Sequence, residues 1–146
     1  MNIKHILIVD DEPSVTRLLK LTLERRSDYC VHTANSGKDA LLAAYTFQPN
    51  LILLDLMMPQ LSGAEVAAQL QQDPSLRHVP VIFLTAAVRA EELGGASGRI
   101  GGRTFVAKPI DASTLLTVVD CALAQHAVAP LRPAAGNFTE LYARVH

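Results

Sequence analysis

The sequence predicts an α/β fold with five parallel strands in a doubly wound sheet. Short runs rich in Ile, Leu and Val recur along the chain, as expected for parallel strands covered on both faces. Between these runs, apolar residues recur at helical spacing. Strands alternating with helices are typical of right-handed βα units. We therefore predict one domain over residues 1–128, followed by a linker or tail over 129–146.

The first three βα units are marked by apolar runs and by helix-start patterns. We predict strands over 3–9, 29–34 and 51–54. Pro13 favours the first turn of the first helix, because its fixed φ suits that position. Ser36 with Asp39, and Ser62 with Glu65, fit the capping-box spacing and predict the starts of the next two helices.

The second half of the domain has one ambiguous segment. We predict strands over 79–84 and 104–107, with Asp111 capping a final helix. Between these strands lies VRAEELGGASGRIGG, whose first half favours a helix. Its glycines each cost up to about 1 kcal/mol in a helix interior. We therefore expect a fourth helix but cannot place its boundaries.

Composition excludes several classes of protein. Hydrophobic residues make up 49% of 146 residues and the formal net charge is −1, which indicates a globular domain without a polyanionic partner such as nucleic acid. No apolar run is long enough to span a membrane. The N-terminal MNIKHILIVDDE is not expected to be a signal peptide, because it reaches acidic residues early. Cys30 and Cys121 show no metal or redox spacing, so we predict buried thiols in a protein of the cytoplasm.

Polar side chains follow four of the predicted strands, at the point where each strand ends. They are Asp10, Asp11 and Glu12 after the first strand, Asp55 after the third, Thr85 after the fourth and Lys108 after the fifth. With the strand order 2-1-3-4-5 these four strands are neighbours, and ligands bind outside their carboxyl ends. Each residue alone fits a loop, a cap or a solvated charge. Their conjunction predicts a single pocket.

The predicted pocket holds more negative than positive charge. Asp10, Asp11 and Asp55 face one cation, Lys108, and carboxylates this close repel one another. A hard divalent cation relieves that repulsion, and Mg²⁺ is the natural candidate for carboxylate ligands. Asp55 can then act as a nucleophile toward phosphorus. Lys108 and the Thr85 hydroxyl can bind the transferring phosphoryl oxygens.

Four segments of the chain resemble the response-regulator receiver domain of two-component signalling. They are ILIVDDEP, LILLDLMMPQLSG, VIFLTA and FVAKPI, and the resemblance covers about residues 3–125. It implies a flavodoxin-like fold in which Asp55 is the phosphoacceptor. Asp10 and Asp11 would hold Mg²⁺, with Asp55 and the backbone carbonyl of Met57 as further ligands.

The resemblance also implies roles for residues around the last strand. Thr85 and Lys108 would bind the phosphoryl group, Phe105 occupies the position of the family's switch aromatic, and the Lys108–Pro109 peptide bond would be cis. One region departs from the family pattern. A Gly-Ala pair commonly precedes the fifth strand of receivers, whereas this chain has ASGRIGGRTF.

As a receiver, the chain is expected to be a phosphorylation-controlled switch rather than an enzyme. A histidine kinase or phosphotransfer protein would supply the phosphoryl group, and the face formed by the fourth helix, fifth strand and last helix would carry the signal. Output would go to an effector protein or to an output domain outside this sequence. Met57 and Ala87 cannot orient an attacking water, so we expect slow self-dephosphorylation.

Three other functions fit the sequence less well. A flavodoxin-like mononucleotide binder needs a Ser/Thr/Gly-rich first loop, whereas DDEPS would repel phosphate. A phosphatase resembling the haloacid dehalogenases carries a DxD motif after its first strand, whereas here Leu56 and Met57 follow Asp55. A degenerate receiver would lack a pocket residue, and none is missing.

Overall fold

A computed structural model describes residues 2–87 and 89–128, so the predicted tail over 129–146 lies outside the described residues. The strands are β1 (Lys4–Val9), β2 (Tyr29–Ala34), β3 (Leu51–Asp55), β4 (Val81–Thr85), β5 (Ser97–Ile100) and β6 (Arg103–Ala107). The helices are α1 (Pro13–Leu23), α2 (Gly37–Phe47), α3 (Gly63–Gln72), α4 (Ala90–Leu93) and α5 (Ala112–Val128). No helix in the described part of the chain is long and apolar enough to cross a membrane.

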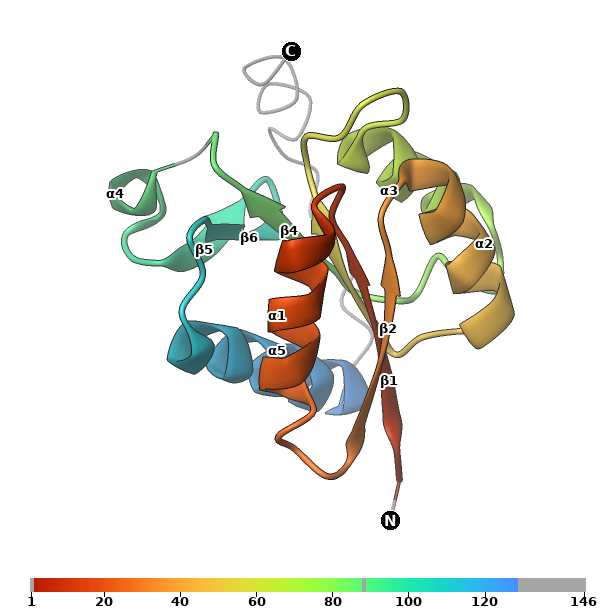
Figure 1. Ribbon diagram of the computed structural model, residues 1–146, viewed down its shortest axis with the longest axis horizontal. Helices are drawn as coiled ribbons and strands as arrows, with labels where there is room; N and C mark the ends of the chain where they lie inside the picture. The colour runs from red at the N-terminus through yellow and green to blue at the C-terminus, as the bar shows by residue number, and fades with distance from the viewer. Residues whose placement is uncertain (1, 88, 129–146) are drawn as a thin grey trace.

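The strands form one sheet in the order β2-β1-β3-β4-β6-β5 (Figure 1). Strands β2, β1, β3, β4 and β6 are parallel, which confirms the doubly wound α/β fold and its 2-1-3-4-5 order. Helices α1 and α5 cover one face, and α2 and α3 cover the other. Every residue of β3 is buried, because this central strand is covered on both faces.

The predicted helix starts are confirmed. Pro13 is the first residue of α1, the Ser36 hydroxyl accepts a hydrogen bond from the Asp39 N–H, and the Ser62 hydroxyl accepts one from the Glu65 N–H. These bonds satisfy amide groups that have no partner within the helix.

The sheet has a sixth strand that the sequence analysis did not predict. Strand β5 pairs antiparallel with β6, and the two are joined by Gly101 and Gly102 with φ of 58° and 77°. Positive φ at both central residues is the requirement of a type I′ hairpin turn, which glycine meets without strain. The glycine-rich segment therefore forms a hairpin, and α4 is reduced to one turn.

The hairpin adds a strand beside the fifth parallel strand, β6. The fifth parallel strand, β6, is not the edge of the sheet, because β5 lies outside it. Phe105 is fully buried and stacks on Phe83, with ring centroids 5.2 Å apart. Leu93 of α4 and Ile100 of β5 pack against the same core. The hairpin thus adds β5 next to the predicted face of the fourth helix, fifth parallel strand and last helix, and the use of that face for signalling stays a prediction.

Candidate functional site

The loop after β1 brings one buried and one exposed carboxylate to the edge of the sheet. Asp10 is fully buried and its Oδ1 accepts a hydrogen bond from the Glu12 N–H, at 3.0 Å. The Asn35 amide donates to the Asp10 backbone carbonyl at 2.8 Å, which joins this loop to the end of β2. Asp11 is exposed, and Glu12 is the exposed residue that precedes α1. Glu12 therefore contributes its backbone to the site.

Asp55 is the last residue of β3 and is also buried. The Met57 N–H donates to Asp55 Oδ1 at 3.3 Å, while the Met57 side chain is largely exposed. Gly63 packs directly on this strand end. A Cβ atom at Gly63 would lie 2.2 Å from the Asp55 carbonyl oxygen, which is far inside van der Waals contact. The Ser-Gly pair at the start of α3 is thus part of what holds Asp55 in place.

Lys108 reaches both buried carboxylates from the end of β6. Its Nζ lies 2.5 Å from Asp10 Oδ2 and 3.5 Å from Asp55 Oδ1. The Lys108 N–H donates to the Thr85 carbonyl at 2.9 Å, which continues the β4–β6 pairing past the strand end. The Lys108–Pro109 peptide bond is cis, as the resemblance implied. The predicted convergence of Asp10, Asp55 and Lys108 is present in the structure.

Thr85 is the last residue of β4, the strand next to the one that ends in Asp55. It is fully buried at the end of β4, and its Oγ1 accepts a hydrogen bond from the Ala87 N–H at 2.9 Å. A hydroxyl that accepts in this way keeps its own proton to donate. Phe105 lies on the same pair of strands but faces the core beside Phe83. Phe105, at the position of the switch aromatic that the resemblance implied, is thus already directed into the core in this structure.

Burial and charge shift the titration of the central groups. Burial raises the pKa of Asp55, the Asp10 charge raises it further, and Lys108 lowers it only in part, so the pKa is about 7 against an ordinary 3.8. Burial alone would lower the pKa of Lys108, but its hydrogen bond to Asp10 and the charge of Asp55 outweigh that effect and raise it. The pocket therefore carries unbalanced negative charge that a cation would relieve.

The donor set fits a hard metal ion. Carboxylate oxygens of Asp10, Asp11 and Asp55 all lie within 4.8 Å of one another. Mg²⁺ binds oxygen ligands at about 2.0–2.1 Å and usually keeps several waters, so a cluster with one solvent-exposed carboxylate, Asp11, suits it. The acidic cluster could thus hold a divalent metal, with Asp11 on the solvent side.

A depression of about 470 Å³ adjoins Lys108 and is lined in part by Ala86, Arg89 and Glu91. Arg89 and Glu91 were not predicted as site residues, because both lie in the segment VRAEELGGASGRIGG, in which the sequence pattern is ambiguous. Arg89 immediately precedes the short helix α4 and Glu91 lies in it, and the sequence pattern did not define this helix.

The fold and pocket together define a class of α/β proteins that carry carboxylates and a lysine at neighbouring strand ends. The model of the response regulator receiver domain matches residues 6–120, and the chain belongs to this family. It is a phosphorylation-controlled signalling domain rather than a classical enzyme.

Curated relatives agree with this assignment. The chain is 44% identical over 107 residues to the alkaline phosphatase synthesis transcriptional regulatory protein PhoP of Bacillus subtilis, which covers 73% of this chain and 42% of PhoP. It is 34% identical over 121 residues to protein PilH of Pseudomonas aeruginosa, covering 82% of this chain and 98% of PilH. The chain thus spans less than half the length of PhoP but nearly all of PilH.

Solved structures show the same fold. The signal receiver domain of a putative Luxo repressor protein from Vibrio parahaemolyticus aligns with a TM-score of 0.71 and 27% identity, covering 86% of this chain and 94% of that one. The chemotaxis response regulator CheY4 of Vibrio cholerae aligns with a TM-score of 0.69 and 27% identity, over 83% and 99% of the two chains.

Proposed function

We propose that Asp55 accepts a phosphoryl group from a phosphohistidine of a sensor histidine kinase or phosphotransfer protein. The observation that carries this proposal is the position of the Asp55 carboxylate, 3.5 Å from Lys108 Nζ and within 4.8 Å of the Asp10 and Asp11 oxygens. This arrangement combines a nucleophile with the groups needed to neutralise a phosphoryl dianion.

In the proposed reaction, an Asp55 oxygen forms a bond to phosphorus while the bond from phosphorus to the donor imidazole nitrogen breaks. The electron pair of the broken bond stays with that nitrogen, and the product is an acyl phosphate on Asp55. Mg²⁺ held by Asp10, Asp11, Asp55 and the Met57 carbonyl would supply positive charge for the phosphoryl oxygens. The raised pKa of Asp55 explains why such a cation is needed, because the carboxylate must be ionised to attack.

Lys108 and Thr85 have separate roles in this proposal. Lys108 moves its charge from the carboxylates toward the new phosphoryl oxygens, from a position that already touches Asp10 and Asp55. Thr85 donates its hydroxyl proton to one of those oxygens, because its Oγ1 is already an acceptor for the Ala87 N–H. Movement at Thr85 would reach β6 through the Lys108 N–H bond and so alter the surface near α4 and β5.

The phosphorylated state is proposed to be long-lived. Met57 and Ala87, which stand near the expected path of the attacking water, are exposed and have no side-chain group that can orient it. We further propose that residues 1–128 act as one cytoplasmic receiver unit. Its output would pass to an effector protein or to an output domain outside this sequence, without contact to nucleic acid or membrane by this chain.

Incubation with Mg²⁺ and acetyl phosphate tests the proposal. Intact-mass spectrometry should show one added phosphoryl group on the parent protein and none on Asp55→Asn. Asp39→Asn is the matched control, because Asp39 is an exposed carboxylate on α2, and it should be labelled like the parent. Labelling of Asp55→Asn to the parental level would contradict the proposal. Chelation of the metal should abolish labelling, and Asp11→Asn should bind Mg²⁺ more weakly.

A further inference from the structure

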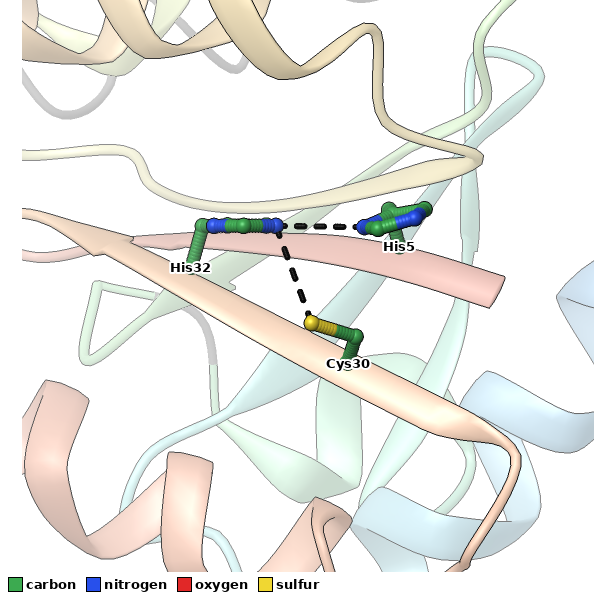
Figure 2. Close-up of side chains that lie close together, drawn as sticks. All are labelled: His5, Cys30 and His32. Carbon is green, nitrogen blue, oxygen red and sulfur yellow. Dashed lines mark hydrogen bonds between the residues drawn. The ribbon is translucent and has the colours of Figure 1, made fainter. Parts of the chain in front are cut away.

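Three potential metal ligands cluster at the opposite end of the sheet from Asp55. They are His5 on β1 and Cys30 and His32 on β2, and each is half-buried. Figure 2 shows the His32 ring with its Nε2 directed toward both the His5 ring and the Cys30 sulfur. We propose that these three side chains form a binding site for a borderline-soft divalent metal, Zn²⁺.

The strand register explains how the three residues meet. His5 lies opposite Cys30, and Leu7 lies opposite His32, in the parallel pairing of β1 with β2. Because side chains alternate along a strand, positions 5, 30 and 32 share the face that is covered by α2 and α3. Val31, between the two β2 ligands, belongs to the opposite core. The clustering is therefore a property of the backbone pairing and does not depend on one flexible side chain.

The distances fit a tetrahedral site. Bonds of about 2.0 Å to nitrogen and about 2.3 Å to sulfur place ligand atoms roughly 3.3 Å (N–N) and roughly 3.6 Å (N–S) apart around zinc. His5 Nδ1 lies 3.2 Å from His32 Nε2, and Cys30 Sγ lies 3.9 Å from the same nitrogen. All three ligand atoms lie within 4.8 Å of one another. The two distances to His32 Nε2 are thus within a few tenths of an ångström of these values, and a metal held by the three ligands would take water at its fourth position.

The surrounding residues hold the ligands in place. The His32 ring stacks on Phe47 at the end of α2, with centroids 3.7 Å apart and planes 16° apart. The His5 backbone N–H donates to Asn50 Oδ1 at 2.8 Å, which holds the backbone at the start of β1 against the loop before β3. The stacking on Phe47 limits rotation of the His32 ring and so lowers the entropy cost of binding a metal.

The chemistry of this site differs from that of the acidic pocket. Strand β1 runs from Lys4 to Val9, so at about 3.3 Å per residue its ends are on the order of 16 Å apart. Carboxylate oxygens at Asp10, Asp11 and Asp55 suit Mg²⁺, whereas imidazole and thiolate suit Zn²⁺. Binding of Zn²⁺ here releases the Cys30 thiol proton to solvent, because the thiolate is the ligand.

A simpler structure would be a hydrogen bond between two neutral imidazoles. That bond accounts for the 3.2 Å contact between His5 and His32. That hydrogen bond does not require the Cys30 sulfur to lie beside His32 Nε2. The position of this sulfur is the feature that favours a metal site. The hydrogen-bonded pair and the metal site differ in their effect on Cys30, because only metal binding uses the Cys30 sulfur as a ligand.

Thiol protection tests the site on the full, untagged chain. The protein is stripped with a chelator, given excess Mg²⁺ to fill the acidic pocket, and alkylated with iodoacetamide with or without one equivalent of Zn²⁺. Mass spectrometry should show Cys30 protected by Zn²⁺, while Cys121, which is exposed on α5, reacts equally in both samples and serves as the internal control. Equal alkylation of Cys30 with and without Zn²⁺ would overturn the proposal.

Variants locate the ligands. Cys30→Ser and His32→Gln should each weaken Zn²⁺ binding by about tenfold or more, since loss of an outer-sphere partner alone costs that much in metal sites. Cys121→Ser and Asp55→Asn should bind Zn²⁺ like the parent. Parental affinity in Cys30→Ser, or lost affinity in Asp55→Asn, would place the metal elsewhere. If a β2 variant fails to fold, Co²⁺ added to the parent protein still decides: a thiolate-to-cobalt charge-transfer band supports the site, and its absence rejects it.

Discussion

Lys108 Nζ lies 2.5 Å from Asp10 Oδ2, so the lysine at the end of β6 is paired with the buried carboxylate at the end of β1. The two residues are 98 positions apart in the chain. Their strands, β1 and β6, are separated in the sheet by β3 and β4. The two residues meet because all four strands end on the same edge of the sheet. This ion pair therefore depends on correct folding of the whole parallel sheet.

Replacing Lys108 by Met should destabilise the metal-free protein by about 1–3 kcal/mol, because Asp10 and Asp55 lose their charged partner. Added Mg²⁺ should recover part of this loss by supplying positive charge. Urea unfolding with chelator and with Mg²⁺ measures both effects. Lys38→Met, at an exposed position of α2, is the control. Equal midpoints for the two variants in chelator would contradict the role given to Lys108.

The raised pKa of Asp55 predicts how stability depends on pH without metal. Its pKa is about 7 in the folded protein and near 3.8 when unperturbed, so between these values the folded state binds more protons than the unfolded state. The contribution of Asp55 to the free energy of unfolding is therefore most favourable below about pH 4 and is lost as the pH rises toward 7. The whole effect is of the order of a few kcal/mol, at about 1.4 kcal/mol per pKa unit.

Asp55→Asn removes this titration and isolates it from other groups, including the histidines. Chemical unfolding in chelator at pH 5 and at pH 8 should show the variant gaining stability relative to the parent at the higher pH. A constant difference between the two proteins across that range would mean that Asp55 titrates normally.

The β5–β6 hairpin makes a prediction about its turn. Gly101 and Gly102 both have positive φ, and Asn is the residue that replaces glycine best at the first position of a type I′ turn. Gly101→Asn should therefore be nearly neutral, whereas Gly101→Val should cost about 1–2 kcal/mol. Thermal unfolding of the matched pair measures this difference. Similar melting temperatures would argue that residues 97–103 do not form this hairpin.

The lifetime of the phosphorylated protein should depend on Met57 and Ala87. Neither side chain can orient a water, so we expect slow decay after the donor is removed and faster decay in Met57→Asn and Ala87→Glu. The amount of phosphorylated protein is followed with time after desalting. If the parent decays as fast as the double variant, water reaches Asp55 by another route and these positions do not control lifetime.

Most of the parallel sheet could be predicted because each buried strand is a continuous apolar run with a polar residue after it. Asp10, Asp55, Thr85 and Lys108 could be grouped for the same reason, since parallel strands end on one edge. The sixth strand was missed, although the Gly-Gly pair between SGRI and RTFV is the pattern of a two-residue hairpin.

Other features depend on details that a linear pattern does not contain. Leu18 of α1 is apolar and adjoins the buried Leu19, but it is 61% exposed because it lies about 100° around the helix from Leu19. Cys121 was expected in the core but is exposed on α5, and Cys30 is half-buried. The grouping of Cys30 with His5 and His32 requires the register of β1 with β2, which spacing along the chain does not reveal.

The central claim is that phosphorylation occurs on Asp55, and chemical trapping of the acyl phosphate tests it most directly. Borohydride reduces an aspartyl phosphate to homoserine, which peptide mass spectrometry can place at a single position. After treatment with Mg²⁺ and a phosphodonor, homoserine should appear at position 55, with unmodified aspartate at positions 10 and 11. Homoserine at position 10 or 11, or phosphorylated protein without homoserine at position 55, would contradict the account.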